Sequence, residues 1–128
     1  LAEGAANAGQ MIPQALAVTV LTSDDTAAPH VAAERMRMAM EAGCGGLVLA
    51  AEDLHDAFTL APKMTRVVPG IRSAGGDTHD QARPATPGEA ISAGADLLVV
   101  GRAVTQADDP VAASASIADE VRATLALR

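Results

Sequence analysis

The chain has 128 residues, enough for one domain with a hydrophobic core and too few for two, so we expect a single domain over 1–128. A net charge of −7 disfavours nucleic acid and anionic membranes as partners, and no apolar run approaches the roughly 20 residues of a membrane span. The single cysteine excludes an intramolecular disulfide and a cysteine metal cluster.

The amino-terminal stretch 1–15 is predicted to be the end of a helix. It contains no charged n-region of a signal peptide, so a cytoplasmic location is the default expectation. Beyond it, short apolar runs rich in Val and Leu are predicted to be strands: Leu16–Leu21, Gly46–Ala50, Arg66–Pro69 and Asp96–Val100. None alternates cleanly with polar residues, which is typical of parallel strands buried on both faces.

Helical segments separate these predicted strands. The first runs from about Pro29 to Ala42, is rich in good helix formers and ends at Gly43. Cys44 follows that end and is predicted to be a small buried thiol rather than a nucleophile. A second, weaker helix is predicted over Ala51–Ala61.

The last two helices have explicit start signals. Thr86-Pro87-Gly88-Glu89 reads as a capping box with proline at the first helical position, and that helix should end at Gly94. Asp109-Pro110 should begin the final helix, where apolar residues recur every four positions at Ile117, Val121 and Leu125.

The predicted order is therefore α-βα-βα-βα-βα, which favours an α/β fold with a parallel sheet and right-handed crossovers. Two architectures satisfy it: a small doubly wound sheet, and half of a (β/α)₈ barrel, whose whole has about 250 residues. A dinucleotide-binding fold would need a G-x-G-x-x-G motif after the first strand. The chain has Thr22-Ser23-Asp24-Asp25 there instead.

Two arginines end similar apolar runs. Arg72 closes Val67–Arg72, Arg102 closes Leu97–Arg102, and each closely follows a glycine. Their spacing of 30 residues (102 − 72) is about one strand-plus-helix unit, which places both at the carboxyl ends of neighbouring parallel strands. Guanidinium groups beside glycines suit a phosphate dianion, so we expect a phosphorylated small molecule as the ligand.

The segment Arg72–Arg83 is rich in Gly and polar residues and lies between a strand and a capped helix. Such a loop is either a lid that closes over a ligand or a solvated connection, and composition alone favours neither.

Several motifs in order resemble the bacterial form of orotidine 5′-phosphate decarboxylase, and the resemblance covers nearly the whole chain. They are Val18–Ser23, Val68–Arg72, Asp80–Arg83 leading into Thr86-Pro87, and Val99–Thr105 followed by Asp109-Pro110. The resemblance implies a (β/α)₈ TIM barrel that forms homodimers. It also implies decarboxylation of orotidine 5′-phosphate to uridine 5′-phosphate without a cofactor.

The resemblance also implies roles for individual residues. Arg72, Gly101 and Arg102 would hold the 5′-phosphate, with Pro69 in the same P-G-I-R motif, and Gln81 would bridge phosphate and pyrimidine. Thr22 would lie near the base with Ser23 beside it. From the residues alone, Thr22 or Ser23 could instead cap a helix, and the arginines could be ordinary surface charges.

One departure concerns the chemistry. The family carries an Asp-x-Lys-x-x-Asp array whose lysine protonates the carbon that loses CO₂. This array is missing here, and the only lysine is Lys63. The chain therefore resembles the carboxyl-terminal half of the barrel, βα units 5–8 preceded by the tail of helix 4. No catalytic residue is assigned, and we expect the chain alone to be inactive.

Two alternatives stay open. The chain could belong to another lyase or epimerase among the ribulose-phosphate-binding barrels, or it could be a non-catalytic half barrel that binds phosphate ligands or self-associates.

His30, His55 and His79 are isolated from one another, so no metal site is expected. The segment after Ser23 also looks shorter than the family usually has.

Overall fold

The structure of the chain, a computed structural model, describes residues 1–21, 23–24, 26–72 and 84–127. Its strands are β1 (Leu16–Val18), β2 (Gly46–Val48), β3 (Thr65–Val68) and β4 (Leu97–Leu98). Its helices are α1 (Ala2–Asn7), α2 (Pro29–Glu41), the 3₁₀ helix η1 (Ala51–Asp53), α3 (Leu54–Leu60), α4 (Pro87–Ser92), α5 (Arg102–Thr105) and α6 (Pro110–Ala126).

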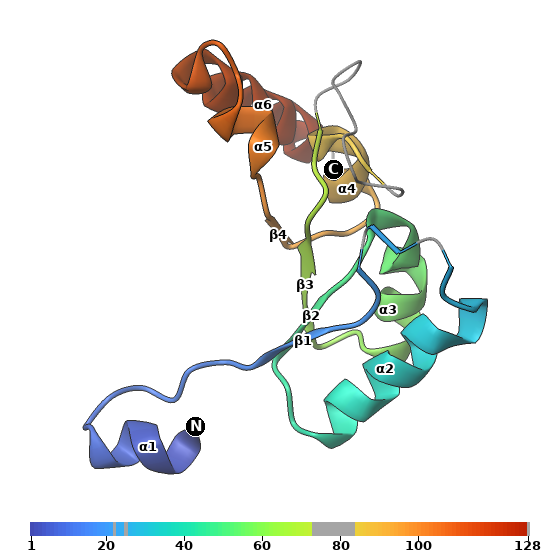
Figure 1. The fold of residues 1–128 in the computed structure, drawn as a ribbon, viewed down its shortest axis with the longest axis vertical. Coiled ribbons are helices and arrows are strands. Elements are labelled where there is room, and N and C mark those ends of the chain that lie inside the picture. The colour runs from blue at the N-terminus through green and yellow to red at the C-terminus, as the bar shows by residue number, and fades with distance from the viewer. Residues whose placement is uncertain (22, 25, 73–83, 128) are drawn as a thin grey trace.

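The strands form one parallel sheet in the order β1-β2-β3-β4, so neighbours in the sequence are neighbours in space (Figure 1). A doubly wound sheet reverses its strand order at a switch point, whereas a barrel adds each strand to the same edge. The uninterrupted order is that of half a (β/α)₈ barrel. It confirms the half-barrel prediction over the small doubly wound sheet.

The strands are shorter than predicted at their carboxyl ends, although their pairing continues for one residue. The N–H of Thr19 donates to Val48 O (3.0 Å), that of Leu49 to Val67 O (3.1 Å) and that of Val99 to Val68 O (2.9 Å). Pro69 has no N–H and cannot extend the ladder further. The loops at the carboxyl edge of the sheet therefore begin after these residues.

The predicted helix signals around α2, α4 and α6 are confirmed. The residues that follow α2 and α4 include Gly43 (φ +72°) and Gly94 (φ +106°), which occupy the left-handed region that favours glycine. Thr86 and Glu89 form the reciprocal capping box of α4, and the Asp109 carboxylate caps α6.

The helices differ from the predictions in three places. Only Ala2–Asn7 is helical in the first 15 residues, because Gly9 (φ +63°) ends that helix and the chain then runs extended. The predicted helix Ala51–Ala61 is divided into η1 and α3. The short α5 was not predicted at all, since its four residues are too few to show a periodic pattern.

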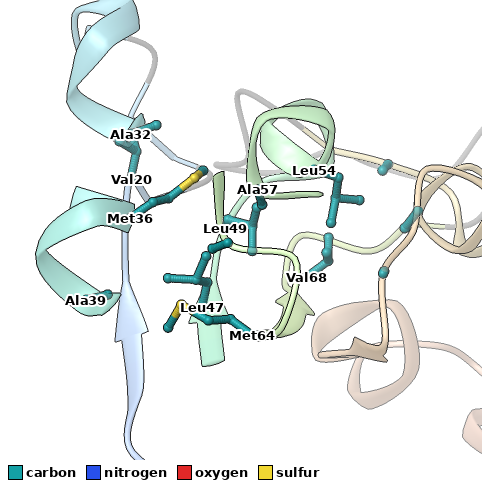
Figure 2. Close-up of a cluster of buried hydrophobic side chains, with 14 of the residues drawn as sticks. Val20, Ala32, Met36, Ala39, Leu47, Leu49, Leu54, Ala57, Met64 and Val68 are labelled. Atoms are coloured by element: carbon teal, nitrogen blue, oxygen red, sulfur yellow. The ribbon is translucent and has the colours of Figure 1, made fainter. Parts of the chain in front are cut away.

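The hydrophobic core lies on one face of the sheet, which we call the outer face and which α2, α3 and α4 cover. Leu47 and Leu49 extend from β2 towards α2 and α3, and Val68 lies beside Leu54 (Figure 2). Cys44, predicted to be buried, is half-buried against this cluster. The opposite, inner face is covered only in part: Leu16, Val18, Leu97 and Val99 are exposed there, whereas Val67 is buried.

A bidentate ion pair fixes β4 beside β3 at their amino ends. The Arg66 guanidinium donates to both carboxylate oxygens of Asp96, Nε to Oδ2 at 2.9 Å and Nη2 to Oδ1 at 3.0 Å. Arg72 and Arg102 each lie six residues further on (72 − 66 and 102 − 96), and the β3–β4 register keeps the same offset of 30. The ion pair therefore helps to set the carboxyl ends of β3 and β4 at the same level, and each arginine follows one of these ends.

Among the described residues, no helix combines the length and the apolar character needed to cross a membrane.

Candidate phosphate-binding site

The first half of the site is the chain that leaves β3. Gly70 adopts φ +76°, a turn that favours glycine, and Ile71 then forms a parallel bridge with Ala85. The N–H of Arg72 donates to Ala85 O at 2.9 Å, and the Arg72 guanidinium donates from Nη1 to Ile71 O at 2.7 Å. The backbone of Arg72 is thus held against Ala85, in the segment that precedes α4.

Arg72 is only 8% exposed. Among the described residues, Arg72 and Thr19 are the polar or charged residues that are buried. A buried guanidinium loses hydration, so it is stable only where hydrogen bonds or an anion compensate. The interpretation of Arg72 as an ordinary surface charge is therefore wrong. A cation held at the carboxyl end of a parallel strand is suited to an anionic ligand.

The second half of the site is the chain that leaves β4. Gly101 stands directly before α5, and a methyl group built on it would meet no atom of the described residues within 4 Å. Packing therefore does not require glycine here, while a ligand could approach this backbone closely. Arg102 begins α5 and is half-buried.

These two halves lie at the same end of adjacent strands. The N–H of Val99 donates to Val68 O, so the ladder brings Pro69 and the residues before Gly101 next to each other. Figure 1 shows both exits leaving the carboxyl edge of the sheet, one towards α4 and the other into α5. The predicted placement of Arg72 and Arg102 at neighbouring strand ends is confirmed, and their role in binding stays a prediction.

The predicted pyrimidine side of the site follows β1. Ser23 is exposed in a turn that the N–H of Asp24 closes on Leu21 O at 3.0 Å. The Asp24 carboxylate then accepts from the N–H and hydroxyl of Thr26 at 3.0 and 2.8 Å. Helix α2 begins after Ala28 without a side-chain cap, so the interpretation of Ser23 as a helix cap is wrong.

Other predicted site residues lie outside the described residues. They are Thr22, next to Ser23, and Gln81, in the segment 73–83.

The only lysine of the chain lies at the end of the sheet opposite to Arg72. Lys63 is exposed in the turn before β3, so it lies at the amino end of the strand whose carboxyl end carries Arg72. It cannot reach a ligand held at the opposite edge. In the part of the chain that the structure describes, no three His, Cys, Asp or Glu side chains gather as metal ligands.

One polar contact near the site was missed. The Arg35 guanidinium of α2 donates to the carbonyl oxygen of Thr19, at the point where the β1–β2 ladder ends. The partners are 16 residues apart, and no local sequence pattern indicates such a bond.

The comparisons with known proteins agree with this geometry. Residues 1–117 match the family model described as "Orotidine 5'-phosphate decarboxylase / HUMPS family". The chain belongs to this family.

Two curated relatives show the extent of the similarity. The chain is 46% identical over 114 residues to orotidine 5′-phosphate decarboxylase from Anaeromyxobacter sp. (strain K), covering 80% of this chain and 50% of the relative. It is 45% identical over 123 residues to the enzyme of that name from Bradyrhizobium sp. (strain BTAi1), covering 88% and 51%. The chain therefore spans about half the length of the curated relatives it matches.

Solved structures show the same coverage. Orotidine 5′-phosphate decarboxylase from Lactobacillus acidophilus superposes with a TM-score of 0.65 at 31% identity, over 89% of this chain and 51% of that one. Orotidine 5′-monophosphate decarboxylase from Sulfolobus solfataricus shares the fold, with a TM-score of 0.71 at 23% identity over 96% and 54%. The four strands thus correspond to about half of the family's barrel.

Proposed function

We propose that this chain supplies the phosphate- and pyrimidine-binding half of an orotidine 5′-phosphate decarboxylase. This carboxy-lyase converts orotidine 5′-phosphate to uridine 5′-phosphate and CO₂ in de novo pyrimidine biosynthesis. The observation that carries the proposal is the position of Arg72 and Arg102 at the carboxyl ends of adjacent strands. A phosphate there could accept charge-assisted hydrogen bonds from two guanidinium groups.

The remaining assignments complete the proposed site. Gly101 would let the phosphate approach the backbone, and Pro69 would shape the turn before Arg72. On the other side, Thr22 and Ser23 would lie beside the pyrimidine, and Gln81 would bridge the two ends of the nucleotide. These roles follow the family motifs on which the residues lie.

The family's chemistry needs a lysine, and the only lysine of this chain does not lie at the site. Loss of CO₂ leaves an electron pair on the ring carbon, and a proton must be delivered there. Arginine stays protonated in proteins and is a poor proton donor, and Lys63 lies at the amino end of β3. The lysine and aspartates would come from a half barrel with βα units 1–4, and no cofactor takes part.

We further propose that this protein works in the cytoplasm and that the complete barrel forms homodimers. The uncovered inner face supports a requirement for further strands, because an apolar sheet face and two open edges favour association.

A reconstitution experiment tests the function. The purified 128-residue chain should convert orotidine 5′-phosphate no faster than the uncatalysed reaction. Co-expression with the amino-terminal half of the Anaeromyxobacter relative should restore turnover, and Arg72→Ala in this chain should then reduce it. Turnover by the chain alone would contradict the division of roles, as would an inactive but assembled complex.

The alternative, another phosphosugar lyase or epimerase, predicts a different ligand preference. Ribulose 5-phosphate is the informative competitor, because the alternative is a ribulose-phosphate-binding barrel. If ribulose 5-phosphate bound the chain more tightly than uridine 5′-phosphate does, the lyase or epimerase would replace the decarboxylase as the proposed function.

A further inference from the structure

Thr19 is a buried junction where β1 leaves the sheet. Its N–H and its hydroxyl both donate to Val48 O, at 3.0 and 3.2 Å, and its carbonyl oxygen accepts from the Arg35 guanidinium. The side chain is fully buried, so each of these polar groups needs a partner within the protein. The junction joins β1, β2 and α2 through one residue.

The carbonyl of Thr19 is the first one past the β1–β2 ladder. The ladder's last bond uses the Thr19 N–H, and among the described residues the donor that reaches the following carbonyl is Arg35. A hydrogen bond at this carbonyl fixes the peptide plane between Thr19 and Val20. The direction in which the chain then runs towards Leu21 depends on that plane, because the backbone has only two soft dihedrals per residue.

Arg35 stands at the edge of the apolar stripe that α2 turns towards the sheet. Ala32, Met36 and Ala39 of this stripe are buried, whereas Arg35 as a whole is exposed and only its guanidinium reaches inward. Its stem therefore adds little to the core. Its main contact with the sheet is a charge-assisted hydrogen bond at the carboxyl end of β1.

We propose that Arg35 is a positioning residue for pyrimidine recognition. It acts through Thr19, and it orients the turn that contains Ser23. This inference rests on the proposed function, in which that turn lies beside the base. It predicts that Arg35 affects the affinity for the base and leaves the affinity for the phosphate unchanged, because Arg72 and Arg102 leave the sheet from other strands.

The test compares two probes on the 128-residue chain by titration calorimetry: uridine 5′-phosphate and ribose 5-phosphate. Arg35→Met should weaken binding of the nucleotide about tenfold, the size expected for one charge-assisted bond, and change ribose 5-phosphate less than about twofold. Arg37→Met is the matched control, since it removes the same charge from an exposed position on the same helix. It should change neither affinity.

A second variant covers the case in which Arg35→Met does not fold. Arg35→Lys keeps a donor and a charge, and it should give a smaller loss confined to the nucleotide. Equal weakening of both probes, or no weakening of either, in the folded variant would overturn the positioning role. If the unmodified chain bound both probes equally, the chain would not recognise the pyrimidine. That result would contradict the proposed function itself and is distinct from a failure of the Arg35 role.

Discussion

The two faces of the β1–β4 sheet have similar apolar composition and very different surroundings. On the outer face, Leu47 and Leu49 are completely buried under α2 and α3. On the inner face, Val18 is 51% and Leu97 55% exposed, although both lie within paired strands. Burial of apolar area is the main stabilising contribution to folding, so the outer face stabilises this chain more than the inner face does.

This contrast separates the features that the chain forms by itself from those that need further strands. The outer face holds the strands in register, and the register places the strand ends that precede Arg72 and Arg102 side by side. The inner face would be covered in a closed barrel, where inward-pointing side chains of all eight strands fill the interior. The chain thus carries the proposed binding edge on a half-covered sheet.

The largest effect should come from matched truncations on the two faces. Leu47→Ala should lower the free energy of unfolding by about 2–5 kcal/mol, because it leaves a cavity in the outer core. Leu97→Ala should lower it by less than about 1 kcal/mol, since much of that side chain already contacts solvent. Urea unfolding followed by circular dichroism measures both, and equal losses would contradict the one-sided core.

A smaller effect should separate the binding edge from the core. Arg72→Ala and Arg102→Ala should each weaken binding of uridine 5′-phosphate by about 1.5–3 kcal/mol, the range for hydrogen bonds to charged groups. Arg122→Ala is the control, because its side chain is 73% exposed and pairs with Asp119 on α6. Calorimetric titration decides, and an unchanged affinity in either variant would remove that arginine from the site.

The smallest effect concerns the helix that follows the site. Thr86→Ala should lower the free energy of unfolding by about 1 kcal/mol, because it removes the acceptor of the Glu89 N–H in the capping box. Ser23→Ala should change stability by less than about 0.5 kcal/mol, since Ser23 caps no helix. A larger loss at Ser23 than at Thr86 would show that the turn after β1 has a structural role that the contacts do not reveal.

Local signals explain which features the sequence predicted. The offset of 30 between Arg72 and Arg102 equals the β3–β4 register, and the Thr86 capping box and the glycines that follow α2 and α4 act within a few residues. These features depend on backbone geometry near each residue, so the chain itself encodes them.

The missed features depend on contacts between distant parts of the chain. The bond from Arg35 to Thr19 joins residues whose approach is set only when α2 packs on the sheet. The periodic apolar residues of α6 are buried unequally, since Ile117 is buried and Leu125 is exposed. Helix α6 packs on α4, where the Glu120 carboxylate accepts from the Gly88 N–H at 2.7 Å, and this packing covers only part of its periodic face.

The central claim is that the inner face requires a covering partner. Sedimentation velocity of the 128-residue chain over a range of concentrations, with urea unfolding of the same samples followed by far-ultraviolet circular dichroism, tests it most directly. We expect association that grows with concentration and a stability that rises with it. A compact monomer that unfolds cooperatively, with a stability independent of concentration and no association, would contradict the claim.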